Sequence, residues 1–212
     1  MFKEIRWKTF PRDFLVAQVG FILFGLAIAL IIKASLGTGA WGVLVVALAE
    51  CLGSSPGMMV ILTGVVALGV ALLLGEEAGW GTVANMLFIG PWLDFFLLFI
   101  PVVEDNLPLQ VAMLLGSIAI IGLASPIYIG VNAGAGPRDS LMLGVSRICG
   151  WSVRLSRVSI ELVILSIGWL LDGPVGVGTL VFALLVGPSV QLGFRLLRVQ
   201  PHRSEPEPVA EI

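Results

Sequence analysis

Charged residues are scarce in this chain of 212 residues. Asp, Glu, Lys and Arg make up 12% of it, whereas a soluble domain carries about 25%. So little charge excludes an ordinary water-soluble enzyme and a disordered protein, and a net charge of −2 leaves no basic field that could hold a nucleic acid. Apolar residues instead reach 58%, with a mean hydropathy of +1.04. This composition predicts an all-α, polytopic membrane protein whose main partner is the lipid bilayer.

Histidine and cysteine are almost absent as well. The only histidine, His202, stands near the C-terminus, so the sequence offers no Ser-His pair and no His-metal site. Cys51 and Cys149 lack the spacing of a metal or redox site, and neither a phosphate-binding loop nor a nucleophile elbow occurs. We therefore expect no catalytic residue, no metal and no cofactor, and a protein that is not an enzyme.

Six apolar segments are long enough to cross a bilayer, which takes about 20 residues of helix. They are residues 14–33, 57–74, 82–100, 109–130, 155–171 and 178–197. Residues 41–52 and 138–149 form two shorter segments of about a dozen residues, and such a helix reaches only about 18 Å. These two are expected to be half-spanning, re-entrant or interfacial, or else short crossings extended by polar ends. No segment alternates as a membrane barrel requires.

Basic residues gather near both termini. Residues 1–13 form a basic tail that lacks the cleavage site of a signal peptide, and residues 198–212 are a Ser/Glu/Pro-rich tail that we expect to be disordered. The positive-inside rule places both tails in the cytoplasm, which requires an even number of crossings.

The chain also contains an internal repeat. When the sequence is shifted by 97 residues, residues 14–100 overlay residues 111–197 without a gap, and a short connection, residues 101–110, joins them. Seven glycines coincide with glycines, where chance would give about one or two. Each repeat therefore contains about four helical segments, three long and one short.

The number of crossings decides how the repeats are related. If the short segments do not cross, each half has three crossings and the halves are inverted, the plan of many transporters. If they do cross, the halves have four crossings each and are parallel. The distribution of Lys and Arg favours six crossings and inverted repeats.

One motif resembles a known family. Residues 134–142 read Gly-Ala-Gly-Pro-Arg-Asp-Ser-Leu-Met, and together with residues 173–179 and 183–188 they resemble the YczE/YyaS/YitT family of bacterial membrane proteins. The first repeat departs from this pattern, because Ala40 stands where the motif has proline and Gly42 where it has aspartate. The resemblance implies an integral protein of the bacterial inner membrane, and it carries no substrate or activity.

The first candidate site is the start of the second short segment. It comprises Gly134, Gly136, Pro137, Arg138 and Asp139, with Gly37 and Gly39 at the equivalent place in the first half. Pro137 and Asp139 suit a helix start, whose free N–H groups attract an anion, and a guanidinium binds carboxylate or phosphate. The alternative is a purely structural helix start with its arginine extended to the lipid headgroups.

The second candidate is a pair of Gly-Pro breaks in two long segments. The residues concerned are Gly90, Pro91 and Asp94 in the first half and Gly187, Pro188 and Gln191 in the second. Discontinuous helices with polar residues at the repeat interface are where transporters bind their substrates, and an intramembrane carboxylate such as Asp94 is costly unless paired. Packing kinks are the alternative.

Two charge pairs complete the list of candidates. Glu161 and Arg157 stand four residues apart, so we expect an ion pair on one helical face, with Glu161 as an alternative proton-coupling carboxylate. Glu50 and Arg147 occupy equivalent positions in the two repeats and could pair across the symmetry axis. The sequence as a whole predicts a transporter of a small polar or anionic solute, with a non-transporting scaffold or accessory subunit as the alternative and homo-oligomerisation left open.

Overall fold

The computed structural model describes residues 7–199, and this part of the chain forms helices without any strand. The helices are α1 (Phe10–Lys33), α2 (Ala40–Leu52), α3 (Pro56–Leu73), α4 (Trp80–Phe99), α5 (Leu107–Ile129), α6 (Pro137–Cys149), α7 (Val153–Leu170) and α8 (Val177–Leu196). The all-α prediction is confirmed, and each expected segment begins and ends within about four residues of an observed helix. Most of the two predicted tails lies outside the described residues.

Local sequence signals explain where the helices begin. The side chains of Ser55 and Ser152 accept hydrogen bonds from the backbone N–H groups of Met58 and Leu155, which caps α3 and α7. Proline stands in the first turn of α1, α3, α5 and α6, where its missing N–H costs nothing. The two short helices both end at a left-handed glycine, Gly53 or Gly150.

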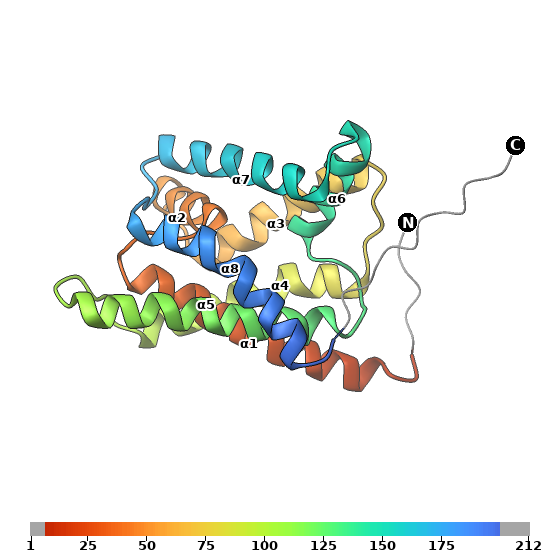
Figure 1. The fold of residues 1–212 in the computed structure, drawn as a ribbon, viewed down its shortest axis with the longest axis horizontal. Coiled ribbons are helices and arrows are strands. Elements are labelled where there is room, and N and C mark those ends of the chain that lie inside the picture. Colours follow the sequence, from red (N-terminus) through yellow and green to blue (C-terminus); the bar gives the residue numbers. More distant parts are fainter. Residues whose placement is uncertain (1–6, 200–212) are drawn as a thin grey trace, which may run out of the picture.

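The helices form two layers (Figure 1). In one layer α1 packs against both α4 and α5, and α5 packs against α8. In the other layer α2 packs against α3 and α7, while α6 packs against the same two helices. Contacts of α4 with α3 and α6 join the layers. Within the first layer α1 and α5 lie side by side and run in opposite directions (Figure 1).

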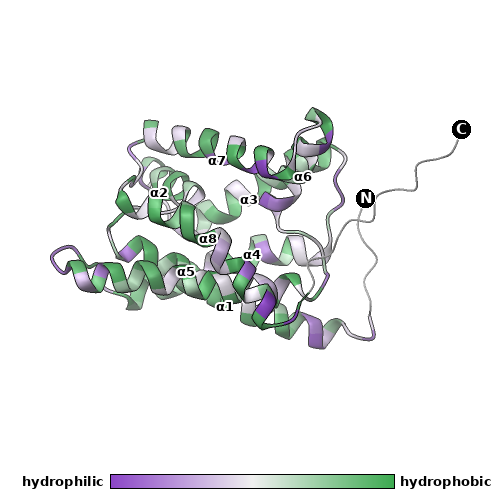
Figure 2. Ribbon diagram, viewed as in Figure 1, coloured by the Kyte–Doolittle hydropathy of each residue, from purple (hydrophilic) through white to green (hydrophobic). Residues whose placement is uncertain are grey.

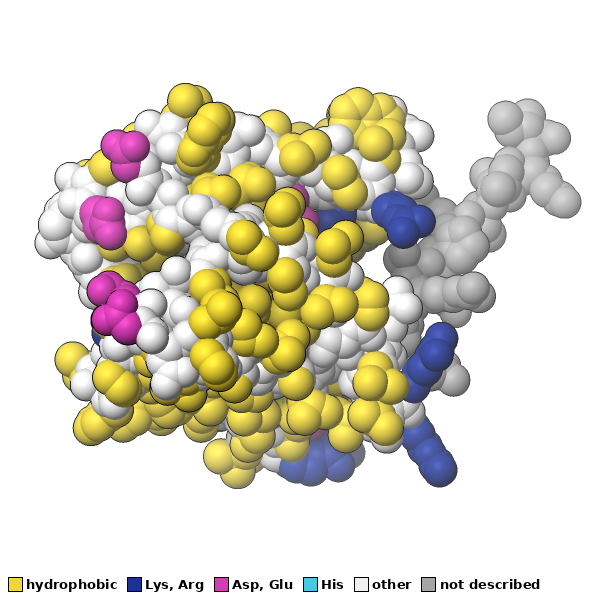
Figure 3. Space-filling model, turned by 60° about the vertical axis from the view of Figure 1, so that its left-hand side comes forward, with side chains coloured by type: hydrophobic (Ala, Val, Ile, Leu, Met, Phe, Trp, Pro, Cys, Tyr) yellow, Lys and Arg dark blue, Asp and Glu magenta, His cyan; other side chains and the backbone are white. Residues whose placement is uncertain are grey.

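The two ends of the bundle differ in charge. At one end, called the acidic end, two pairs of segments meet. The end of α1 lies beside the α4–α5 loop, because Val103 N–H donates to the carbonyl oxygen of Lys33. The α1–α2 loop contacts the α7–α8 loop, because Thr38 N–H donates to the carbonyl oxygen of Pro174. The opposite end, called the basic end, holds the first turn of α1 and the last turn of α8 (Figure 1). Acidic and basic side chains gather on opposite sides of the molecule in Figure 3. The acidic end holds Glu50, Glu104, Asp105 and Asp172 with one basic residue, Lys33. The basic end holds Lys8, Arg12, Arg147, Arg154, Arg195 and Arg198 with three acidic residues, Asp13, Glu76 and Glu77, so each end keeps an excess of one sign.

Within residues 7–199, five helices are long and apolar enough to cross a membrane, namely α1, α3, α4, α5 and α8. The ribbon is hydrophobic along most of their length (Figure 2). The remaining long helix, α7, has 18 residues but carries Arg154, Arg157 and Glu161 in its first half. The short helices α2 and α6 have 13 residues each. At the acidic end α2 connects the end of α1 to the start of α3, and at the basic end α6 connects the end of α5 to the start of α7 (Figure 1).

The Gly-Pro sequences do not interrupt their helices, which differs from the prediction of broken helices. Both α4 and α8 continue through Pro91 and Pro188. A proline removes a single backbone hydrogen bond, and membrane helices tolerate this loss where neighbouring groups compensate. Gly90 serves a different purpose, because a Cβ atom on it would lie 2.4 Å from the carbonyl oxygen of Gly57. The glycine thus allows α3 and α4 to approach closely.

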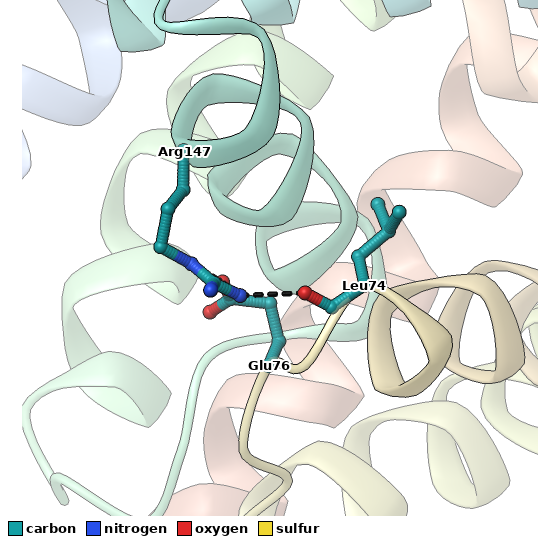
Figure 4. A network of polar contacts seen from close by, with 3 residues as sticks. All are labelled: Leu74, Glu76 and Arg147. Atoms are coloured by element: carbon teal, nitrogen blue, oxygen red, sulfur yellow. Dashed lines mark hydrogen bonds and ion pairs between the residues drawn. The ribbon is translucent and has the colours of Figure 1, made fainter.

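The pairing of Glu50 with Arg147 is also wrong. Arg147 instead binds Glu76 with Nε and Nη2, at 3.2 and 3.0 Å, and donates from Nη2 to the carbonyl oxygen of Leu74 at 2.6 Å (Figure 4). The physical reason is distance, since α2 ends at the acidic end and α6 at the basic end. The arginine therefore satisfies one free carbonyl group at the end of α3.

Candidate functional site

The loop that precedes α6 is fixed to the first turn of α4. The carbonyl oxygen of Ala133 accepts a hydrogen bond from Gly81 N–H at 2.9 Å, and the hydroxyl of Thr82 donates to the carbonyl oxygen of Ala135 at 2.6 Å. Gly134 has a φ of +116°, which only glycine adopts without strain. These contacts hold the start of α6 beside the second turn of α4.

Polar atoms from three helices converge at that helix start. A Cβ atom on Gly136 would lie 3.3 Å from Oδ2 of Asp139 in α6, and 3.8 Å from both Oδ1 of Asn85 in α4 and the hydroxyl oxygen of Tyr128 in α5. Within residues 7–199 none of these three side chains forms a hydrogen bond, and all three are half-buried. We call this group of Asn85, Tyr128, Gly136 and Asp139 the polar recess. Unpaired groups at this depth are costly unless water or a ligand satisfies them.

Arg138 connects the polar recess to the other half of the chain. Its guanidinium carbon lies 4.7 Å from the centre of the Trp41 ring, at the start of α2, an arrangement typical of a cation–π contact. The side chain forms no ion pair within the described part of the chain, although Asp139 is its neighbour in sequence. Its donors therefore remain available, which favours the binding interpretation over an arginine extended to the headgroups.

The ion pair between Arg157 and Glu161 is confirmed. Arg157 Nε lies 3.1 Å from Oε1 of Glu161 on the exposed side of α7. Both residues interact electrostatically with Asp139, so α7 contributes charges near the polar recess. The proton-coupling role of Glu161 stays a prediction.

The equivalent loop of the first half is closed by an aromatic side chain. Gly178 N–H donates to the carbonyl oxygen of Leu36 at 2.7 Å, which holds this loop against the first turn of α8. A Cβ atom on Gly39 would lie 2.5 Å from the ring of Phe182, and one on Gly37 would lie 2.5 Å from the backbone of Gly176. Gly37 and Gly39 therefore occupy filled surroundings rather than a second recess.

Asp94 lies away from the polar recess and caps a helix. The hydroxyl of Ser55 donates to its Oδ2 at 2.5 Å, and Gly57 N–H donates to its Oδ1 at 2.7 Å. A carboxylate at the start of α3 also complements the dipole of that helix. These bonds favour a structural role, and the predicted role in proton coupling is not needed to explain this carboxylate. Its counterpart Gln191 is exposed and forms no hydrogen bond within residues 7–199.

Sequence reasoning missed three residues of the site. Asn85 stands alone in an apolar segment, a signal that could have identified it, because isolated polar residues inside the membrane are commonly functional. Tyr128 is the only tyrosine of the chain. Trp41 falls on Arg138 when the sequence is shifted by 97 residues, so the predicted repeat could have paired the two.

Comparisons with known proteins agree with the membrane fold. The model of a family of unknown function, DUF6198, matches residues 11–195. The uncharacterised membrane protein YczE of Bacillus subtilis is 32% identical over 186 residues, which cover 86% of this chain and 82% of the relative. An uncharacterised protein of Haemophilus influenzae is 29% identical over 92% of this chain and 89% of its own length.

The uncharacterised protein YyaS of Bacillus subtilis is 26% identical over 80% of this chain and 86% of the relative. No solved structure matches the chain. The family match extends from the first turn of α1 to the last turn of α8, and it agrees with the resemblance inferred from residues 134–142. The chain therefore belongs to the family of unknown function DUF6198.

Proposed function

We propose that this protein transports a small polar or anionic solute across the bacterial inner membrane and binds it in the polar recess beside Arg138. One observation carries the proposal. Three polar side chains, those of Asn85, Tyr128 and Asp139, converge around Gly136 and form no hydrogen bond among residues 7–199. They do so in a bundle whose helices are mostly apolar enough to cross a membrane. A solute with a carboxylate or phosphate group would receive hydrogen bonds from Arg138, Tyr128 and Asn85, and Asp139 would accept from its donors.

Helix bounds support the inverted repeat that such a transporter requires. Shifting α2, α3 and α4 by 97 residues reproduces the bounds of α6, α7 and α8 residue for residue, and α1 starts 97 residues before α5. The neighbours correspond too, because α1 packs on α4 as α5 packs on α8, and α2 on α7 as α6 on α3. Opposite directions of α1 and α5 in Figure 1 favour inverted over parallel halves.

Charge supports six crossings with both termini in the cytoplasm. Basic residues of the described chain concentrate at the end that holds the first turn of α1 and the last turn of α8 (Figure 3). The positive-inside rule makes this the cytoplasmic end. In this orientation the polar recess, built at the starts of α4 and α6 and the end of α5, lies on the cytoplasmic side.

Ligand-induced stabilisation tests the proposal. The purified protein in detergent is heated with acetate, phosphate, sulfate or L-alanine as probes for anions and zwitterions. A probe present at 100 times its Kd stabilises the folded state by about 2.7 kcal/mol. We expect the transition temperature of the wild type to rise with at least one probe, and this rise to be absent in Arg138→Ala.

Arg154→Ala is the matched control, because this arginine also lies in the first turn of a helix near the basic end but is exposed, and it is not among the residues nearest Gly136. It should keep the full shift. Equal shifts in Arg138→Ala and Arg154→Ala would contradict the proposed site. A folded wild type that none of the four probes stabilises, and that moves none of them in labelled form into liposomes, would favour the scaffold instead.

A further inference from the structure

The two halves of the bundle differ in one contact. At the acidic end α3 is tightly joined to α4, because a Cβ atom on Gly57 would lie within 2.5 Å of both Gly90 O and the Asp94 carboxylate. The equivalent helices α7 and α8 do not pack along each other, and they spread apart toward the basic end (Figure 1). A Cβ atom on Gly187, the counterpart of Gly90, would meet no atom within 4 Å. The α3–α4 pair is therefore closed near the acidic end, whereas the α7–α8 pair is open toward the basic end.

Side chains on α7 and α8 are suited to close against each other. In the closed pair, Gly64 of α3 faces Met86 of α4, and a Cβ atom on Gly64 would lie 2.8 Å from Met86 Cγ. The equivalent positions hold Glu161 on α7 and Ala183 on α8. In α3–α4 the large side chain, Met86, belongs to the second helix of the pair, whereas in α7–α8 the large side chain, Glu161, belongs to the first. Volume is conserved by this exchange, which leaves room for the Glu161 side chain when α7 approaches α8.

The same comparison indicates what closure would do to the ion pair on α7. Arg157 and Glu161 correspond to Val60 and Gly64, which are both buried, and Gly64 faces Met86 of α4. In the open arrangement their side chains are 50% and 38% exposed. Closure would remove this pair from water, and desolvation of an ion pair opposes burial unless the partners are well bonded. The pair thus favours the open arrangement.

We propose that α7 and α8 form a gate at the basic end, and that it closes when the α3–α4 contact at the acidic end opens. This inference rests on the proposed transport function and supplies its second conformation. Inverted halves that exchange arrangements expose a central site to one side of the membrane and then to the other. The polar recess lies between the two layers of helices and toward the basic end, so closing a gate at that end would change its access.

Cysteine cross-linking on the full chain tests the gate. In a background where Cys51 and Cys149 are replaced by serine, Val158→Cys is combined with Gly187→Cys, because the equivalent pair Ile61 and Gly90 is in contact in the closed half. Leu162→Cys with Gly187→Cys is the control. Leu162 lies one turn further along α7 and is similarly exposed. It corresponds to Val65 of α3, which remains exposed although α3 packs on α4, so closure should not bring Leu162 to Gly187. With copper phenanthroline in membranes, the test pair should cross-link at least ten times faster than the control.

A second disulfide tests the reciprocal movement. A Cβ atom on Gly64 would lie 3.5 Å from Met86 Cβ, a separation that suits a disulfide, so Gly64→Cys with Met86→Cys should lock α3 to α4 in their closed arrangement. Formation of this lock also shows that the variant is folded. The lock should reduce cross-linking of the 158–187 pair at least fivefold.

Three results would decide the matter. Equal rates for the test and control pairs would overturn the gate, and cross-linking that ignores the lock would overturn the coupling between the two ends. The measurement needs no solute, so its failure differs from failure of the binding site, which is judged by the Arg138-dependent thermal shift. Fast cross-linking that the lock suppresses would support the proposal.

Discussion

Close backbone contacts at single glycines hold neighbouring helices of this protein together. Gly193 of α8 is the tightest case, because a Cβ atom there would lie 1.8 Å from the carbonyl oxygen of Gly122 in α5. Packing without a hydrophobic driving force depends on such close approach between membrane helices. The close packing of α5 on α8 thus requires that position 193 carry a hydrogen atom and no methyl group.

Replacing Gly193 by alanine should therefore destabilise the protein by about 1–3 kcal/mol, since the methyl group forces α5 and α8 apart. Gly116→Ala is the control, because this glycine lies inside α5 and a Cβ atom on it would meet nothing within 4 Å. Alanine is the better helix former, so Gly116→Ala should be neutral or slightly stabilising. Thermal unfolding in detergent measures both variants. Equal loss of stability would show that helix propensity, and not the α5–α8 contact, governs these positions.

At the level of the helix, the start of α3 depends on a side chain from another helix. Asp94 of α4 accepts hydrogen bonds from the hydroxyl of Ser55 and the N–H of Gly57. Asp94→Ala leaves both donors without this acceptor and should cost about 1–2 kcal/mol, whereas Asp94→Asn keeps one acceptor oxygen and should cost less.

Gln191→Ala is the control at the equivalent position of α8, where no hydrogen bond forms within the described residues, and its stability should change by less than about 0.5 kcal/mol. Thermal unfolding gives the stabilities. The probe that stabilises the wild type should still stabilise folded Asp94→Ala by the same amount. A lost shift in that variant would restore Asp94 to the binding or coupling role that its sequence position indicated.

Sequence patterns predicted the helices better than the site. Hydrophobic length and glycine punctuation located every helix within a few residues, because in lipid the backbone must satisfy its own hydrogen bonds. Arg138 and Asp139 could be identified from a motif, but Asn85 and Tyr128 belong to other helices and join them only through packing. The prediction that the Gly-Pro pairs break their helices was wrong for a related reason. Their meaning depends on the neighbour, which is Gly57 for Gly90 and empty space for Gly187.

At the level of the whole molecule, the two ends carry opposite charge and one cysteine each. Cys51 lies in the last turn of α2, at the acidic end, and Cys149 is the last residue of α6, at the basic end. Both are exposed. Six crossings with cytoplasmic termini place Cys51 outside and Cys149 inside, because α2 and α6 return to the side from which they start. Eight crossings would place both cysteines inside.

Labelling with a membrane-impermeant maleimide separates these topologies. In intact spheroplasts, the Cys149→Ser variant, which keeps Cys51, should be labelled, and the Cys51→Ser variant, which keeps Cys149, should not. Permeabilised spheroplasts should label both variants to a similar extent, which controls for accessibility. Protection of both cysteines in intact spheroplasts, followed by labelling after permeabilisation, would favour eight crossings. It would remove the inverted repeat on which the gate depends, because halves of four crossings each insert in parallel.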